Sequence, residues 1–480
     1  MRLDELTAAL SCQIFGASET EISGIQYDSR KVKEGDLFFC ISGFKTDGHD
    51  YAEAAVKQGA AALMVTRKLD IDIPQVLVAD DRLAMAEMAC QFYDNPAKKL
   101  ITIGVTGTNG KTTITYMLKS ALEKAGKKVG MIGTIHNMIG EEVIKTEHTT
   151  PEAPDLNALL DRMVKEGCEA LVIEVSSHSL ALKRVAGIDF DIGIFTNLTQ
   201  DHLDFHTDFE DYAAAKAKLF AASNISILNA DDRAYKTMRA SAKGEVKLYG
   251  VENKADYTAD DIDVAPEGLS FNYYKNTHLV QRLNMHVTGY FNTYNALAVL
   301  STLDMLGLPQ TVGIEALETM HAVDGRCQVL PTGDRGFSVI LDYAHTPDSL
   351  ESTISSVRRF AKGRIITVFG CGGDRDAKKR PIMGEISGRL SDFSVITTDN
   401  PRTEDPFKIL DQIEVGMKQT KGTYTVIENR REAMKHAMQM AKADDIVILA
   451  GKGHETYQEI NGVKYDFDEK KVVKELLDEI

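Results

Sequence analysis

The 480-residue chain contains no hydrophobic run that approaches the length of a membrane-spanning helix. Such a helix needs about 20 consecutive apolar residues, so the sequence predicts no membrane insertion. Residues 1–5 lack the basic and apolar regions of a signal peptide, which is the pattern expected of a cytoplasmic protein. The formal net charge of −16 argues against binding to nucleic acid or to an anionic membrane, because both favour basic surfaces.

Cysteine is scarce, and its spacing does not match metal-binding patterns. The six scattered cysteines suit reduced thiols in a cytoplasm and are expected to pack as small core residues: Cys12, Cys40, Cys90, Cys168, Cys327 and Cys371. The sequence also has no internal repeat and no low-complexity tract. A chain of this length exceeds what one hydrophobic core usually supports, so several domains are expected.

Strand-like and helix-like patterns alternate along three successive segments, 1–98, 99–326 and 327–480. The first segment indicates a small α/β domain, and the apolar strands of the other two are typical of parallel sheets covered on both faces. The expected strands are 24–27, 37–41, 61–65, 75–78, 100–103, 129–132, 170–175, 192–196, 225–228, 337–341, 364–369, 393–397 and 446–449.

A glycine-rich turn, 104–113, joins the strand expected at 100–103 to a helix that begins near Lys111. The backbone N–H groups of such a turn bind phosphate together with the helix dipole. Lys111 is placed to reach the β- and γ-phosphates of a nucleotide, and the Thr112 hydroxyl is placed to bind Mg²⁺. Val105 stands where the general phosphate-loop pattern has glycine, so an ordinary strand-to-helix turn is the alternative.

Polar side chains follow the later strands of the second segment, at the sheet edge where α/β proteins bind ligands. Carboxylate and imidazole groups beside a phosphate-binding turn fit a divalent-metal shell, and the predominance of oxygen favours Mg²⁺. Turns and helix caps explain each residue taken alone. The residues are Glu174, Ser176, Ser177, His178, Asn197, Asp201, His202, Asn229, Asp231 and Asp232.

Four polar loops follow the strands of the third segment, at 342–345, 370–375, 399–402 and 451–455. Arg375, Arg402 and Glu455 on one rim favour a zwitterionic ligand, because arginine binds a carboxylate and glutamate binds an ammonium group. Any one loop is also explained by turn formation alone. In the second segment, Lys216 stands among alanines in a helix expected at 211–221, and the local pattern favours a solvated helix face.

Taken together, these motifs resemble the Mur ligases, the ATP-dependent amide-forming enzymes of peptidoglycan synthesis. The resemblance covers essentially the whole chain, and the shortened phosphate loop of that family accounts for Val105. The matching motifs are GTNGKTT at 107–113, HTTP at 148–151, EVSSH at 174–178, TNLTQDHLD at 196–204, YAAAK at 212–216, NADD at 229–232, NTYN at 292–295, DGR at 324–326, DYAHTP at 342–347 and DNPR at 399–402.

The resemblance implies an α/β protein of three domains. Residues 1–98 would bind the UDP end of a nucleotide substrate, residues 99–326 would form an ATPase around a parallel sheet, and residues 327–480 would form a Rossmann-like amino-acid-binding domain. It also implies a cytoplasmic, monomeric, Mg²⁺-dependent ligase. The D-Glu carboxylate of UDP-N-acetylmuramoyl-L-alanyl-D-glutamate would attack the γ-phosphate of ATP, and an amino acid would then displace phosphate from the acyl phosphate. The product would be a UDP-muramyl tripeptide for the cell wall, on which cell shape and division depend.

By resemblance, the site residues fall into groups. ATP is assigned to Gly107, Thr108, Asn109, Gly110, Lys111, Thr112, Thr113, Asn292, Asn295, Arg326, Asp342 and His345. The UDP-muramyl peptide is assigned to Ser29, Thr149, Thr150, Ser176 and Arg184. Mg²⁺ is assigned to Thr112, Glu174, His202 and Lys216, and the catalytic residues are Lys111, Glu174, His202 and Lys216.

The resemblance also reverses the local interpretation of Lys216. Mur ligases carry a carbamylated lysine here, an N6-carboxylysine whose oxygens help to hold Mg²⁺. The reaction with CO₂ needs a neutral amine, which lysine can supply because its pKa moves readily on burial. Lys218 is the nearby alternative, but the register of the motif selects Lys216.

The amino acid added is expected to be meso-2,6-diaminopimelate. The DNPR motif resembles that of diaminopimelate-adding Mur ligases, whereas lysine-adding relatives usually lack the final arginine. Diaminopimelate has a second carboxylate at its far end, and lysine would leave the arginine without that partner. The residues assigned to this substrate are Arg375, Asp399, Asn400, Pro401, Arg402, Gly451 and Glu455.

Three alternatives are left open by the sequence. The first is the same ligation with L-lysine. The second is a folylpolyglutamate synthetase, which shares the ligase core but lacks a comparable UDP-binding first domain, so that residues 1–98 and DNPR both disfavour it. The third is a nucleotide-dependent switch without amide synthesis, which leaves Lys216 and the amino-acid rim unexplained.

Overall fold

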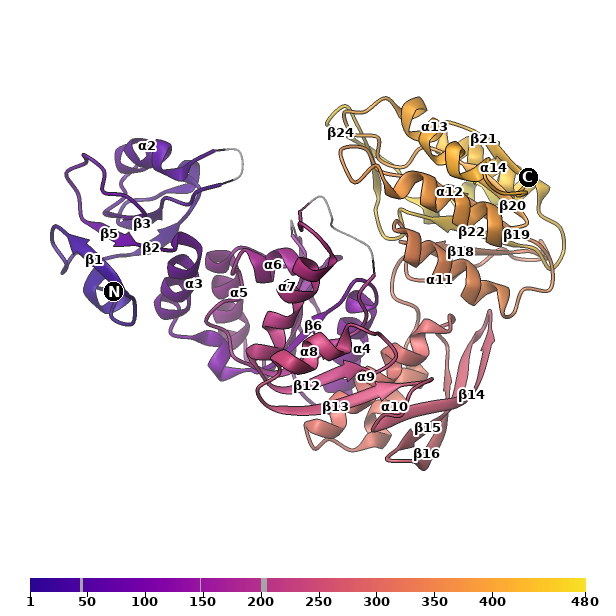
Figure 1. Cartoon of the computed structure of the whole chain (residues 1–480), viewed down its shortest axis with the longest axis horizontal. Coiled ribbons are helices and arrows are strands. Elements are labelled where there is room, and N and C mark those ends of the chain that lie inside the picture. Colours follow the sequence, from indigo (N-terminus) through magenta and orange to yellow (C-terminus); the bar gives the residue numbers. More distant parts are fainter. Residues whose placement is uncertain (44–45, 147, 200–204) are drawn as a thin grey trace.

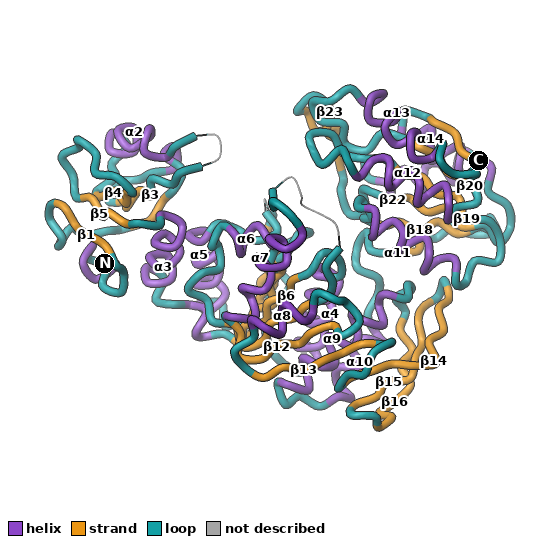
Figure 2. The backbone as a smooth tube through the Cα atoms, viewed as in Figure 1, coloured by secondary structure: helices purple, strands orange, loops and turns teal. Residues whose placement is uncertain are grey.

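The computed structural model describes residues 1–43, 46–146, 148–199 and 205–480. The chain forms three lobes in sequence order, and the N-terminal and C-terminal lobes lie at opposite ends of the molecule (Figure 1). Helices pack against a sheet in each lobe (Figure 2), and this alternation confirms the predicted α/β class. No helix among the described residues has the length and apolar character needed to cross a bilayer.

The N-terminal lobe contains a five-stranded sheet in the order β1-β5-β4-β3-β2. Apolar residues of α3 pack on one face of this sheet, and residues of α2 pack on the other. Its elements are α1 (Leu3–Leu6), β1 (Cys12–Phe15), β2 (Gly24–Gln26), η1 (Ser29–Lys31), β3 (Asp36–Phe39), η2 (Gly48–Tyr51), α2 (Ala52–Lys57), β4 (Ala62–Val65), β5 (Gln75–Val78), α3 (Asp81–Phe92) and η3 (Pro96–Lys99).

The central lobe is built on an eleven-stranded sheet with β6 in its middle, in the order β16-β15-β14-β13-β12-β11-β6-β10-β7-β8-β9. The elements are β6 (Ile101–Thr106), α4 (Lys111–Lys124), β7 (Val129–Ile132), β8 (Asn137–Ile139), β9 (Glu142–Ile144), α5 (Ala153–Lys165), β10 (Ala170–Glu174), α6 (Ser177–Ala181), β11 (Phe190–Phe195), α7 (Phe209–Ala221), β12 (Ser223–Asn229), α8 (Tyr235–Ser241), β13 (Glu245–Gly250), β14 (Tyr257–Ala265), β15 (Gly268–Lys275), β16 (His278–Met285), α9 (Phe291–Met305) and α10 (Gln310–Thr319).

The topology of this sheet places the glycine-rich turn where ligands bind in α/β folds. β6 pairs in parallel with β10 on one side and with β11 on the other. Helices α4, α9 and α10 cover one face, and α5, α7 and α8 cover the other. The loops that follow β6, β10 and β11 therefore emerge together at one sheet edge, on both sides of the point where the strand order reverses.

The antiparallel strands β14, β15 and β16 were not anticipated from the sequence. β14 pairs with β15 and β15 with β16, but the register shifts between Asp260 and Asp263 and again between Tyr273 and Tyr274. Each β-bulge inserts a residue and reverses the side-chain alternation. The period-two pattern that identifies strands is therefore interrupted within this hairpin region.

The C-terminal lobe contains a six-stranded sheet in the order β17-β18-β22-β19-β20-β21, with α11, α12 and α13 on one face and α14 and α15 on the other. The elements are β17 (Gln328–Leu330), β18 (Ser338–Asp342), α11 (Pro347–Arg358), β19 (Ile365–Phe369), α12 (Lys379–Leu390), β20 (Phe393–Ile396), α13 (Pro406–Met417), β21 (Tyr424–Val426), α14 (Arg430–Met440), β22 (Ile446–Ala450), β23 (Tyr457–Ile460), β24 (Val463–Asp466) and α15 (Glu469–Glu479).

Strands β18, β22, β19 and β20 are adjacent and parallel, so the four polar loops after them share one edge of the sheet. The hairpin β23–β24 lies beside this edge, where the Arg402 amide donates to the Glu459 carbonyl at 3.0 Å. This arrangement forms a second ligand-ready rim, separate in the fold from the turn after β6.

Candidate active site

The glycine-rich turn between β6 and α4 requires glycine at two positions. Gly107 has φ +150°, and a Cβ atom there would lie 1.8 Å from the Thr196 hydroxyl oxygen. Gly110 has φ +89°, and its Cβ atom would lie 2.7 Å from the side-chain oxygen of Asn295. The turn can therefore pack against the neighbouring loop and α9 only because these two positions carry no side chain.

Lys111, the first residue of α4, folds back over the turn. Its ammonium group donates to the carbonyl oxygens of Gly107 at 2.9 Å and Thr108 at 2.8 Å. The loop after β11 supports the same turn, since Thr196 Oγ1 donates to the Asn109 carbonyl at 2.6 Å. A lysine at the N-terminus of a helix that follows a glycine-rich turn is the arrangement that binds nucleotide phosphates.

Glu174 ends β10 next to the first turn of α4 and is fully buried. Its carboxylate accepts hydrogen bonds from the Thr112 hydroxyl at 3.1 Å, the Thr134 hydroxyl at 3.1 Å and the Thr134 amide at 2.8 Å. These donors are all neutral. A buried carboxylate surrounded by neutral donors gains from a nearby cation, so Glu174 and the Thr112 oxygen fit a Mg²⁺ site.

The described residues do not by themselves complete a metal shell. Within those ranges, no group of three or more His, Cys, Asp and Glu side chains could hold a metal ion. His202, assigned to Mg²⁺ and to catalysis, and Asp201 lie outside the described residues. Their assignment stays a prediction.

Lys216 lies in the third turn of α7 and is 1% exposed. Its ammonium group donates to the Gly107 carbonyl at 2.8 Å, the same oxygen that accepts from Lys111. The local expectation of a solvated helix face is therefore wrong for Lys216, whereas Lys218 is exposed. The face of α7 that carries Lys216 packs against the phosphate-binding turn.

Four of the five residues assigned to the UDP-muramyl peptide gather beside Glu174. Thr150 Oγ1 donates to the Glu174 carbonyl at 2.7 Å, and Arg184 donates to the Thr150 carbonyl at 3.0 Å. Thr149 Oγ1 lies 3.1 Å from the Thr134 hydroxyl, and Ser176 is the N-cap residue of α6. Ser29 lies apart from them, at the start of η1 in the N-terminal lobe.

The segment after α10 and the C-terminal lobe supply the opposite side of this region. Arg326 donates to the Thr112 hydroxyl at 3.1 Å, and its guanidinium lies 4.7 Å from the ring centre of Tyr343. Asp348, in the first turn of α11, accepts a hydrogen bond from the Asn109 amide at 2.7 Å. Burial raises the pKa of the Asp348 carboxyl. The phosphate-binding turn is thus contacted from both lobes.

A cavity of about 750 Å³ lies between these two sides. That volume suits a nucleotide and a second reactant. The residues assigned to a ligand that line it are Thr108, Asn109, Gly110, Lys111, Thr112, Thr113, Thr149, Thr150, Glu174, Ser176, Arg184, Asn295, Arg326, Asp342 and His345. Polar residues expected at the strand ends line it as well: His178, Asn197, Asn229, Asp231 and Asp232. Tyr294 and Tyr343 lie within the NTYN and DYAHTP motifs but were given no role, whereas Tyr290, Phe291 and Asp348 were missed, because single aromatic or acidic residues carry no distinguishing sequence pattern.

Three other predicted residues lie directly behind this lining. The Gly107 carbonyl accepts hydrogen bonds from both Lys111 and Lys216, so Gly107 and Lys216 lie next to the residues that line the cavity. Asn292, 1% exposed, accepts a hydrogen bond from the Asn295 amide at 2.7 Å. Asn292 therefore orients Asn295, and in this structure its own amide donates to the Thr288 carbonyl at 2.7 Å.

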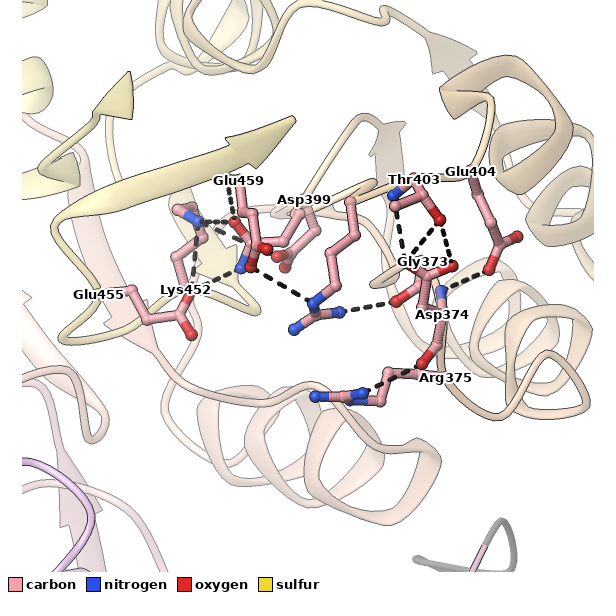
Figure 3. Close-up of polar contacts among 11 residues, drawn as sticks. Gly373, Asp374, Arg375, Asp399, Thr403, Glu404, Lys452, Glu455 and Glu459 are labelled. Carbon is pink, nitrogen blue, oxygen red and sulfur yellow. Dashed lines mark hydrogen bonds and ion pairs between the residues drawn. The ribbon is translucent and has the colours of Figure 1, made fainter. Parts of the chain in front are cut away.

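The residues assigned to the amino acid form the separate rim of the C-terminal lobe (Figure 3). Arg402 donates to the Gly373 carbonyl at 2.7 Å and faces Glu459 at 3.5 Å. The Asn400 amide donates to Glu455 at 2.8 Å. Arg375 and Glu455 lie on opposite sides of the group of residues drawn in Figure 3. The rim thus carries both cationic and anionic groups, as a zwitterionic ligand requires.

Gly451 and Asp399 of this rim pack so closely that no side chain fits at position 451. Gly451 has φ +116°, and a Cβ atom there would lie 2.4 Å from a carboxylate oxygen of Asp399. Asp399 is 6% exposed, and Pro401 precedes Arg402, whose φ of +51° lies in the left-handed region. Non-glycine residues adopt that region at a cost, which is characteristic of functional turns.

Three family models match the chain. The Mur ligase middle domain matches residues 105–303, the glutamate ligase domain of Mur ligases matches 325–453, and the catalytic domain of the Mur ligase family matches 21–93. A UDP-N-acetylmuramoyl-L-alanyl-D-glutamate--2,6-diaminopimelate ligase of Caldanaerobacter subterraneus subsp. tengcongensis is 48% identical over 100% of this chain and 99% of its own. The chain belongs to the Mur ligase family.

Other relatives agree over the full length. The Clostridioides difficile protein of the same name is 46% identical, with 99% of each chain covered. A solved structure of a ligase of that name is 33% identical, has a TM-score of 0.72 and covers 100% of this chain and 99% of its own. A folylpolyglutamate synthase of Mycobacterium tuberculosis shares the fold alone, with 14% identity, a TM-score of 0.64 and coverage of 77% of this chain and 92% of its own.

The geometry of the turn leads to a first prediction. Gly107→Ala should lower kcat/KM for ATP by roughly 100-fold, because the clash with Thr196 displaces the turn and a displacement near 1 Å can cost that much. Gly126→Ala, at the other end of α4, is the matched control, since Gly126 also has a positive φ of +85° but nothing within 4 Å of its Cβ position. Steady-state kinetics with varied ATP measure both. Equal effects of the two changes would contradict the role of the turn.

Proposed function

We propose that this Mur ligase joins meso-2,6-diaminopimelate to UDP-N-acetylmuramoyl-L-alanyl-D-glutamate with hydrolysis of ATP to ADP and phosphate. One observation carries the choice of amino acid: Arg402 and Glu455 place opposite charges on a single rim of the C-terminal lobe. The full-length relatives bear the name of this reaction. The substrate-binding, ATP-binding and amino-acid-binding domains are proposed as residues 1–98, 99–326 and 327–480.

The first half of the reaction would take place in the cavity after β6. Lys111 and the N-terminus of α4 bind the phosphates, and Asn295, Arg326, Asp342 and His345 hold the rest of ATP. The D-Glu carboxylate attacks the γ-phosphorus, and the bond to the bridging oxygen of ADP breaks. When bound, Mg²⁺ offsets the repulsion between this carboxylate and the triphosphate. We assign it to Thr112, Glu174, His202 and the carbamate of Lys216.

The UDP-muramyl peptide would reach the same cavity from the N-terminal lobe. Thr149, Thr150, Ser176 and Arg184 lie beside Glu174, so they are placed to hold the peptide end of the substrate. Ser29 is assigned to the UDP end, which suits its position in a different lobe. The reaction uses two anionic reactants in an acidic protein, so local arginine, lysine and helix N-termini must supply the attraction.

The second half of the reaction would use the rim. Arg375 and Arg402 bind the distal carboxylate of diaminopimelate, and Asp399, Asn400, Gly451 and Glu455 bind its distal ammonium group. The other amino group, once neutral, attacks the acyl phosphate, and phosphate leaves from the tetrahedral intermediate. Lysine lacks the distal carboxylate and would leave Arg402 facing only protein groups, which penalises its binding.

The ligation itself is the decisive test. Purified protein with ATP, Mg²⁺ and the UDP-muramyl dipeptide should form product with meso-diaminopimelate and little or none with L-lysine, as measured by mass spectrometry of the nucleotide product. Phosphate release should require both the dipeptide substrate and the amino acid. Efficient use of lysine alone would contradict the substrate assignment, and phosphate release without ligation would favour a nucleotide switch.

A change at Arg402 tests how the amino acid is selected. Arg402→Ala should raise KM for diaminopimelate about 10- to 100-fold, because a charge-assisted bidentate pair is lost, and should leave KM for ATP within about 2-fold. Arg389→Ala is the control, since Arg389 lies on the same lobe but pairs with Glu351 at the surface. An equal rise in both KM values for Arg402→Ala would show general damage to the lobe instead.

We also propose that Lys216 is carbamylated. Carbamylation requires an unprotonated amine, the form that burial favours. Lys111 and Lys216 donate to the same carbonyl oxygen of Gly107. Conversion of Lys216 to a carbamate would replace two like charges around this oxygen by an opposite pair, and would add oxygen ligands close to Thr112 and Glu174 for Mg²⁺.

Lys216→Ala should therefore reduce kcat at least about 100-fold, whereas the exposed Lys218→Ala should leave it within about 2-fold. A readout independent of activity is the carbamate signal in carbon-13 NMR after incubation with labelled bicarbonate. That signal should be present in the Lys218 variant and absent in the Lys216 variant. A carbamate signal that persists in Lys216→Ala would assign the modification elsewhere.

The cellular setting and the oligomeric state follow as proposals. ATP and a UDP-linked precursor are cytoplasmic metabolites, and six reduced cysteines suit the same compartment. Each reactant has assigned residues within one chain, so we propose that the enzyme acts as a cytoplasmic monomer.

A further inference from the structure

Lys452 is a buried cation in the amino-acid rim that the proposed reaction does not yet use. It lies in the loop after β22 and is 0% exposed. Its ammonium group donates to the Asn400 side-chain oxygen at 3.1 Å and to Glu455 at 3.3 Å, and it lies 4.0 Å from Asp399 (Figure 3). A lysine is rarely buried to this extent unless its charge is paired, and here the three partners belong to the predicted ligand set.

The contact with Lys452 fixes which way the Asn400 amide points. The oxygen of this amide accepts from Lys452 and from the Glu459 backbone amide at 2.9 Å. The nitrogen must then face the other way, where it donates to Glu455 at 2.8 Å. Lys452 therefore orients Glu455 twice, by a direct ion pair and through Asn400.

Lys452 also allows two carboxylates to lie close together. Burial raises the pKa of the Glu455 carboxyl, and the charge of Lys452 opposes that rise. Burial acts against ionisation of Asp399 as well, but Lys452 and then Arg430 outweigh it and hold the pKa of Asp399 below its usual value. Without Lys452, two anions intended for an ammonium group would repel each other in a dry site.

Several other charged or titratable groups face this cluster. Arg430 at the start of α14 forms an ion pair with Glu469 of α15 at 2.8 Å. Its charge therefore acts on Glu469 as well as on Asp399 of the rim. Arg402 and Glu459 close the side next to β23. The remaining groups are Tyr343 and His345 after β18, Lys379 of α12 and Tyr457 of β23. Among these groups, Lys379 and Arg430 act on Asp399 as cations of fixed charge, but only Lys452 contacts Asn400 and Glu455 together.

We propose that Lys452 is a positioning residue for the ammonium-binding half of the diaminopimelate site, which it builds by holding Asp399, Asn400 and Glu455 in one arrangement. The inference rests on the proposed function, because it concerns the same amino acid. Lys452 does not touch the reacting atoms in this arrangement. Its effect should therefore appear in the binding of the amino acid and not in the use of ATP or of the UDP-muramyl dipeptide.

The test compares Lys452→Met with Lys464→Met. Both lysines lie over the ring of Tyr457, at 5.8 Å and 4.0 Å, but Lys464 is exposed on β24 and makes a surface contact only. Lys452→Met should raise KM for diaminopimelate about 10- to 100-fold, because charge-assisted hydrogen bonds are lost, with KM for ATP and dipeptide within about 2-fold. Lys464→Met should change none of the three constants.

A pH profile separates this role from a purely structural one. Asp399 and Glu455 bind an ammonium group only when they are ionised, and loss of a neighbouring cation raises the pKa of both. The acidic limb of kcat/KM for diaminopimelate should therefore move to higher pH by about one unit in Lys452→Met. Lys452→Arg keeps the charge, so it should keep the limb near the wild-type position even if KM rises.

Three outcomes would overturn the proposal: an unchanged KM for diaminopimelate in Lys452→Met, a parallel rise in all three KM values, or an acidic limb that moves in Lys452→Arg. If Lys452→Met does not fold, the position of the acidic limb of kcat/KM in Lys452→Arg is the measurement that tests the proposal. The wild-type enzyme distinguishes the two levels of inference. A wild-type protein that does not ligate diaminopimelate contradicts the proposed function, whereas an active wild type with an unaffected variant contradicts only the role of Lys452.

Discussion

The carbonyl oxygen of Gly107 is the point on which the central lobe depends, since it accepts hydrogen bonds from both Lys111 and Lys216. Lys111 comes from the helix that follows the turn, and Lys216 comes from α7 on the opposite face of the sheet. One backbone oxygen thus joins the two helical layers at the edge of β6. The Thr108 and Asn109 amides of the turn donate to Asn197, so the N-terminus of α4 is the part of this motif suited to phosphate.

The second site lies on another sheet, and a short chain of contacts connects it to the first. Arg326 contacts Thr112 in the phosphate-binding helix and lies over the ring of Tyr343. The same ring lies 4.8 Å from that of His454, which directly precedes Glu455 of the rim. Burial, followed by the charge of Arg326, lowers the pKa of His454 to about 3, so the imidazole stays neutral at working pH. A neutral ring can lie beside Arg326 without repulsion.

Local sequence predicted the fold best where a short motif of fixed residue types determines the local structure. The phosphate-binding turn followed from glycine, lysine and threonine in a fixed order, and β14–β16 were missed because their bulges interrupt the alternation. Local pattern failed for Lys216, since which face of α7 is buried depends on the turn 109 residues earlier in the chain. The family resemblance assigned Lys216 to the site as a carbamylated ligand of Mg²⁺, and that assignment stays a prediction.

The site was predictable to the extent that its residues touch a ligand and therefore have a recognisable chemical type. Thr150 belongs to the HTTP motif and Arg184 was assigned by the family resemblance, and both lie at the cavity. Lys452 lies in the polar loop 451–455 but was assigned to no ligand. Its burial beside Asp399 and Asn400 depends on β20 and β22 ending at the same edge of the sheet, a consequence of strand order that adjacent residues do not reveal.

Charge explains why the enzyme divides its work between two rims. The cavity must hold a carboxylate and a triphosphate, so its functional side chains include Lys111, Arg184 and Arg326. The lining of this cavity also contains carboxylates, among them Glu174, Asp342 and Asp348, which suit a bound cation. The rim on the other sheet carries its own set of charged groups, which suits a zwitterionic ligand. In the rim, Lys452 lies beside Asp399 and Glu455 and opposes the effect of burial on the pKa of both carboxyls.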